Sequence, residues 1–249
     1  MTRLKAATMA LAIPFVAAWN QTQAFGQCCG DCDGDGQATV DEIVTVVNRA
    51  LSGCVDDEVC GAGTGRLPAT GQTTFYGSGS DGDVWDGAAL SYTDNGDGTI
   101  TDNNTGLMWE KKDDSGGIHD KDNAYTWGMT DPPYTMNGTM VTTFLATLNA
   151  GGGFAGHTDW RIPNIKELQS IVNYEIVYPG PVVSAAFNTG CTLGCTVTSC
   201  SCTVSSNYWS STTTQHTPGS AWYVGFYGGD VSFVNKDYNY FVRVVRDGS

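Results

Sequence analysis

Residues 31–42 place oxygen-bearing side chains at a spacing that suits a hard divalent cation. Three aspartates alternate with other residues, a glycine follows the third, and a glutamate ends the stretch, so every fixed position of D-x-[DN]-x-[DN]-G-x5-E is filled. Calcium takes about six to eight oxygen ligands, which alternating carboxylates and a bidentate glutamate supply. We therefore expect Ca2+ as a cofactor, with the ligands Asp31, Asp33, Asp35, Gln37 through its backbone carbonyl, Thr39 and Glu42.

Apolar residues at helical spacing follow this loop, from Val40 to Leu51, and predict an exiting helix. No entering helix fits before Asp31, so the layout resembles a dockerin repeat or another extracellular EF-hand-like loop. Dockerins carry two such repeats, whereas one is visible here. The alternative to a calcium site is an acidic turn exposed to solvent.

A second acidic stretch covers residues 94–102 but does not have the calcium spacing, because Thr93 stands at the first ligand position. Its Asn-Gly and Asp-Gly pairs are strong hairpin signals. We expect a structural turn there.

Residues 1–27 have the pattern of a secretory signal peptide, with a buried N-terminal helix as the weaker alternative. Arg3 and Lys5 precede an apolar stretch over residues 6–19, which is too short to span a bilayer comfortably. We expect a secreted protein, extracellular or at the cell surface, with no membrane insertion after cleavage. The nine cysteines fit that oxidising route.

The composition excludes one class of partner. The chain has 249 residues, 26 acidic against 12 basic, for a formal net charge of −14. Such a chain lacks the positive surface that phosphate backbones require, so nucleic acid is excluded. Hydrophobic residues make up 41% of the chain, enough for a core, while 32 glycines and only 15% charged residues predict short strands and many turns.

The chain after the signal divides into a cysteine-rich calcium module at residues 28–60, a linker at 61–69 and an α+β domain at 70–249. In that domain two helices are expected, the second opened by a capping box of Asn164 and Glu167. The expected helices cover residues 141–149 and 164–174, and the expected strands cover residues 208–212, 221–227, 231–235 and 240–246, with a hairpin turn at Gly228-Gly229.

Four cysteines, Cys191, Cys195, Cys200 and Cys202, lie in a Thr/Ser/Gly-rich insertion. Their spacing differs from the paired C-x2-C of a zinc ribbon, so two disulfides are favoured over a zinc site. Three connectivities are open. Five more cysteines lie between residues 28 and 60, and their odd number leaves one without a partner inside the module.

Several sequence segments follow one another in the order typical of one secreted bacterial family. They are LPATGQTTFY (67–76), YTDNGDGTITDNNTGLMWEK (92–111), DWRIPNIKELQSIVNY (159–174), YWSSTT (208–213) and AWYVGFYGGDVSFVNKDYNYFVRVVR (221–246). From about Leu67 to Asp247 the chain resembles the Lcl C-terminal domain of collagen-like adhesins. The resemblance implies a C-type-lectin-like α+β fold, related to formylglycine-generating enzymes, and a binding role with glycans as the ligand class.

The resemblance also implies that the ligand face uses aromatic and polar residues of the last strands. Aromatic faces stack on sugar rings, and Asn or Asp side chains hydrogen-bond sugar hydroxyls. The expected ligand residues are Tyr227, Asp230, Asn235, Asp237, Tyr238, Asn239 and Tyr240, with ordinary loop surface as the alternative. Trp160, Trp209 and Trp222 are expected in the core, because tryptophan is usually buried.

The sequence gives no positive sign of catalysis. Val244 stands where the family often has a cysteine, no G-x-S-x-G is present, and the three histidines are scattered and expected to be structural. We expect a secreted, calcium-binding, lectin-like protein that is not an enzyme and that binds a glycan or another cell-surface ligand. The alternatives are an assembly module tethered to a protein partner through residues 28–60, and a display protein that binds another protein.

Overall fold

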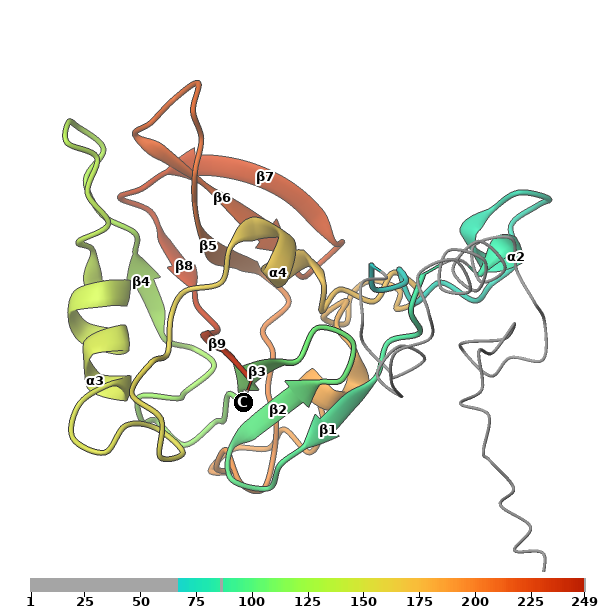
Figure 1. Ribbon diagram of the computed structural model, residues 1–249, viewed down its shortest axis with the longest axis horizontal. Helices are drawn as coiled ribbons and strands as arrows, with labels where there is room; N and C mark the ends of the chain where they lie inside the picture. Colours follow the sequence, from blue (N-terminus) through green and yellow to red (C-terminus); the bar gives the residue numbers. More distant parts are fainter. Residues whose placement is uncertain (1–66, 86, 249) are drawn as a thin grey trace, which may run out of the picture. The chain divides into compact units, whose positions relative to one another are not determined.

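The computed structural model describes residues 67–85 and 87–248, which lie in one compact unit. The predicted signal peptide and calcium loop lie outside the described residues. The described part of the chain is rich in β-sheet and has few, short helices (Figure 1). That agrees with the short strands and many turns expected from the composition.

The smaller sheet has four antiparallel strands in the order β1-β2-β3-β9. They are β1 (Tyr92–Asp94), β2 (Thr99–Asp102), β3 (Leu107–Glu110) and β9 (Val245–Asp247). The acidic stretch at residues 94–102 forms the β1–β2 hairpin, as predicted, with Gly96 at a φ of +76°. Its Asp94 carboxylate lies 2.7 Å from Lys111 Nζ, so this turn already has a cationic partner.

The larger sheet has five strands in the order β4-β8-β5-β6-β7. They are β4 (Ala124–Thr126), β5 (Asn207–Thr213), β6 (Ser220–Gly225), β7 (Asp230–Asn235) and β8 (Asn239–Phe241). Three predicted strands and the Gly228-Gly229 turn are confirmed, but the single strand predicted over residues 240–246 is wrong. The chain leaves the larger sheet after Phe241 and enters the smaller one at Val245, because the buried Arg243 between them bonds to other parts of the chain.

The helices are α2 (Asp81–Val84), the π-helical η1 (Met140–Leu145), α3 (Ala146–Leu148), α4 (Ile165–Gln169) and the 3-10 helix η2 (Ala185–Phe187). Both predicted helices are present, the first as η1 and α3. The second, α4, has the predicted capping box but ends at Gln169 instead of residue 174. It ends early because Val172 bridges to Val183 and is buried in the core.

Two hydrophobic clusters fill the domain, and they meet at β5. Tyr208 belongs to one cluster and Trp209 to the other, since successive side chains of a strand point to opposite faces. Trp160 and Trp209 are buried, as predicted, whereas Trp222 is only half-buried and packs edge-on against Phe233. Within the described residues no helix is long and apolar enough to cross a membrane.

Replacing Asn164 with alanine tests the capping box. Its Oδ1 accepts hydrogen bonds from the backbone N–H groups of Lys166 and Glu167 at 2.9 and 3.0 Å. We expect Asn164→Ala to lower the free energy of unfolding by about 1 kcal/mol, measured by urea denaturation. Lys166→Ala is the matched control, because that side chain is exposed and makes no hydrogen bond or ion pair with the described residues. Equal losses in the two variants would contradict the prediction.

Candidate functional site

The pairing of three strands creates a polar and aromatic surface on one face of the larger sheet. Paired residues of neighbouring strands share a face. The register places Asn207 of β5 and Asp230 of β7 on either side of Gly225 in β6. Two residues further along β5, on the same face, it pairs Trp209 with Tyr223 of β6.

Gly225 is needed at the centre of this surface. A Cβ atom at that position would lie 2.4 Å from Asp230 Oδ1 and 2.7 Å from Tyr227 Cε1. Both side chains therefore lie over the bare backbone of Gly225, although Tyr227 belongs to the turn between β6 and β7.

The rings of four tyrosines gather around this point. The ring centroids of Tyr223 and Tyr240 are 5.0 Å apart, and those of Tyr238 and Tyr240 are 6.3 Å apart. Tyr240 also packs at 4.8 Å on the fully buried Trp209, which anchors the group to the core. We call Tyr223, Tyr227, Tyr238, Tyr240, Asn207 and Asp230 the tyrosine surface.

The polar side chains of the tyrosine surface interact with its phenol groups. Asn207 Oδ1 and Asp230 Oδ1 are enclosed by the surrounding side chains. Hydrogen bonding to the Asp230 carboxylate raises the pKa of Tyr227, and burial and the charge of Asp230 raise it further. Burial raises the pKa of Tyr240. Both phenols therefore stay neutral near pH 7 and present hydroxyl groups beside an anionic carboxylate.

The sequence-predicted ligand residues separate into two groups. Tyr227, Asp230, Tyr238 and Tyr240 belong to the tyrosine surface. Asn235 lies at the other end of β7 from Asp230, where it accepts a hydrogen bond from the Ser220 hydroxyl at 3.2 Å. Asp237 and Asn239 are exposed on either side of Tyr238.

Two members of the tyrosine surface, Tyr223 and Asn207, were not predicted from the sequence. Tyr223 stands two residues before Gly225, so strand alternation puts the two on one face and is the signal that points to it. Asn207 gives no such signal, because its place depends on the pairing of β5 with β6.

A disulfide-bonded loop lies between η2 and β5 in the chain. The structure pairs Cys191 with Cys202 and Cys195 with Cys200, so one disulfide is nested inside the other. The buried Arg243 donates hydrogen bonds to the carbonyl oxygens of Cys202 and Glu110, both at 2.7 Å. This guanidinium thus joins the disulfide loop to β3.

Glu110 forms the centre of a buried charged group. Its Oε1 lies 3.0 Å from Lys112 Nζ and 2.8 Å from His119 Nδ1. Burial by itself raises the pKa of Glu110, but the charge of Lys112 and the hydrogen bond with His119 outweigh it and lower that pKa. These contacts give His119 a structural role, as predicted.

A group of three carboxylates lies near this network. Oxygen atoms of Asp114, Asp120 and Asp122 lie within 4.8 Å of one another, a separation that a cation could bridge. However, Lys121 Nζ is 3.4 Å from Asp114 and 2.7 Å from Asp122, and Asp120 accepts backbone hydrogen bonds from Gly116 and Asp122. The protein itself therefore supplies partners for this group.

Acidification tests the Glu110 network. The pKa of the Glu110 carboxyl group is lower in the folded state than in the unfolded state, where it is about 4.3. Its contribution to stability is therefore fully present above the unfolded pKa and is lost as the pH falls through the folded pKa. We expect the unfolding free energy to drop below pH 4, and Glu110→Gln to lower it by about 3 kcal/mol at pH 7, because Lys112 then lacks a counter-charge.

The control is Asp131→Asn, an exposed side chain that makes no hydrogen bond or ion pair with the described residues. Urea denaturation at pH 7 and at pH 3 should show a smaller pH difference for Glu110→Gln than for the wild type or for Asp131→Asn. An unchanged pH difference would show that Glu110 is not the responsible group.

The family model described as the Lcl C-terminal domain matches residues 98–246, which is more than half of the chain and includes the tyrosine surface. No curated protein and no solved structure matches the chain.

Proposed function

The chain belongs to the Lcl C-terminal domain family, and we propose that it is a secreted, calcium-binding, lectin-like protein that binds glycans without catalysis. The C-type-lectin-like fold is part of this proposal. Two sheets joined by short helices and long turns are the coarser architecture that supports it.

The observation that carries the proposal is the tyrosine surface. Tyr227 and Tyr238 are 40% and 53% exposed, so both rings are open to solvent. Their rings offer flat apolar faces for the C–H groups of a sugar ring. The hydroxyl groups of these tyrosines donate and accept hydrogen bonds, as sugar hydroxyls do.

Charge selects among glycans. Asp230 is the one charged member of the tyrosine surface, and the whole chain has a net charge of −14. A sulfated polysaccharide would be repelled by both. The proposed ligand is therefore a neutral glycan.

Truncating the exposed rings tests this ligand face. We expect Tyr227→Ala combined with Tyr238→Ala to weaken glycan binding about tenfold or more, because the stacking faces are lost. Binding is measured on a glycan array and then by titration with the strongest neutral hit.

The control is Phe233→Ala, which removes an exposed ring from β7 on the opposite face of the same sheet. Equal melting temperatures of the variants show that the fold is retained. If no glycan binds the wild type, or if the tyrosine variant binds as well as the Phe233 variant, the proposal is wrong.

Calcium is tested separately through the loop at residues 31–42. We expect calcium to raise the melting temperature of the wild-type chain and chelator to reverse the rise, because an ion that binds only the folded state stabilises it. Asp31→Ala combined with Asp33→Ala should abolish the shift, and Asp56→Ala, an acidic residue outside the loop, should retain it. A shift that persists in the double variant would place the ion elsewhere.

A further inference from the structure

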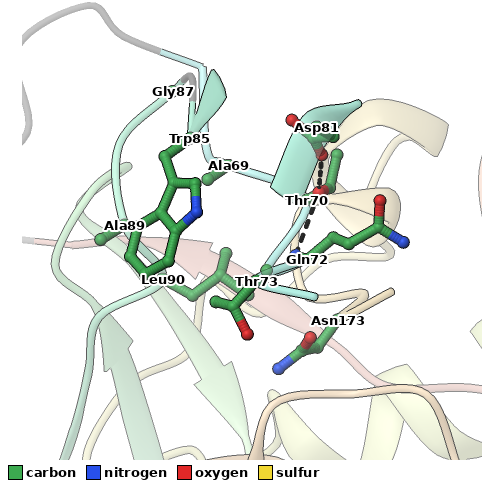
Figure 2. Close-up of a pocket in the computed structure, with 11 residues that line it drawn as sticks. Ala69, Thr70, Gln72, Thr73, Asp81, Trp85, Gly87, Ala89, Leu90 and Asn173 are labelled. Carbon is green, nitrogen blue, oxygen red and sulfur yellow. Dashed lines mark hydrogen bonds between the residues drawn. The ribbon is translucent and has the colours of Figure 1, made fainter. Parts of the chain in front are cut away.

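A cavity of about 280 Å³ lies apart from the tyrosine surface. It shares no residue with the tyrosine surface, and its walls come from residues 69–73, Asp81, Trp85, Gly87, Ala89, Leu90 and Asn173. Figure 2 shows the indole of Trp85 on one side and the side chains of Gln72 and Asn173 on the other. Most of its lining precedes the span matched by the family model, so the family match does not account for it.

Trp85 is held in an unusual conformation at this cavity. It follows α2 with a φ of +54° and a ψ of +47°, the left-handed region that bulky residues rarely adopt. Its indole Nε1 donates a hydrogen bond to the carbonyl of Gly82 at 2.6 Å, which fixes the ring. The residue nevertheless remains 65% exposed. Backbone strain of this kind collects at ligand-binding positions.

The walls opposite Trp85 are anchored to the body of the domain. The Glu175 carboxylate accepts hydrogen bonds from the backbone N–H groups of Thr73 and Thr74 at 2.7 and 3.0 Å. Gly71 has a φ of +80°, and a Cβ atom there would lie 2.4 Å from Asn173 Oδ1. A glycine is therefore needed to bring this wall against Asn173.

The chemistry of the lining limits what it can hold. Trp85, Ala89 and Leu90 give an apolar wall, and the lining contains no lysine or arginine. The backbone N–H of Gln72 donates a hydrogen bond to Thr70 Oγ1, whereas its side-chain amide and the Nδ2 atom of Asn173 make no hydrogen bond with the described residues. Asp81 is acidic and accepts a hydrogen bond from Thr70. An anionic ligand is disfavoured, and a ligand with one apolar face and several hydroxyl groups is favoured.

We propose that this cavity binds one neutral pyranose unit, which stacks on Trp85 and hydrogen-bonds Gln72 and Asn173. Drug-sized ligands fill pockets of roughly 300–1,000 Å³, so a cavity of about 280 Å³ admits a single ring. The site is an addition to the proposed function and does not depend on it.

The test observes the indole N–H signal of Trp85 by NMR in the full-length chain. The probes are glucose, galactose, mannose and N-acetylglucosamine, with glucuronate as the anionic counterpart. We expect at least one neutral sugar to shift the signal saturably, and glucuronate to bind about tenfold more weakly or not at all. If none of the neutral sugars shifts the signal, or if glucuronate binds equally well, the proposal is overturned.

Variants identify the residues responsible. Trp85→Gly tolerates the left-handed backbone and should weaken binding of the same sugar about tenfold or more, measured by calorimetry. Gln72→Ala removes a side chain that makes no hydrogen bond with the described residues, and it should weaken binding severalfold without changing the melting temperature. Phe75→Ala, a 63% exposed ring in the same segment outside the lining, is the matched control and should bind normally.

The two sites fail independently. Tyr227→Ala with Tyr238→Ala should leave monosaccharide binding at Trp85 intact. Loss of monosaccharide binding in those tyrosine variants, or unchanged binding in both Trp85→Gly and Gln72→Ala, overturns the Trp85 site. The proposed function stands if the wild type and Trp85→Gly both bind the glycan array and the variant with both tyrosine substitutions does not.

Discussion

The buried guanidinium of Arg243 is the contact on which the rest of the domain depends. It is fully buried and donates hydrogen bonds to the carbonyls of Glu110 and Cys202 and to the Thr203 hydroxyl. A buried charge without such partners is strongly destabilising, so these groups must converge wherever the arginine lies. That requirement joins β3, the disulfide loop and the segment between β8 and β9. It thereby fixes where the chain passes from one sheet to the other.

Local signals in the sequence predicted the elements that local interactions determine. The capping box at Asn164 and the glycine pair after Tyr227 involve residues close in sequence, and both are in place. The end of α4 and the division of residues 240–246 into two strands were not predictable in this way. Both depend on long-range contacts, the pairing of Val172 with Val183 and the hydrogen bonds of Arg243, which periodicity does not report.

The same distinction applies to the candidate sites. Exposed tyrosines in the last strands pointed to part of the tyrosine surface, but Asn207 reaches it only through the register of β5 against β6. Trp85 was harder still, because a tryptophan in a glycine-rich segment gives no sign that its backbone is left-handed or that Asn173 lies across a cavity from it. Nothing in the local sequence indicates that the charged side chains of Glu110 and Lys112 are buried.

The order of the smaller sheet has a consequence for how the protein is made. β3 lies between β2 and β9, so residues 107–110 pair on one side with residues 245–247. The ribosome releases β9 after the other strands of the described residues, and until then that side of β3 is an unpaired edge. Pairings between residues so distant in sequence form slowly. The domain therefore completes its fold only after β9 has emerged, and a chain whose synthesis stops early exposes an aggregation-prone edge.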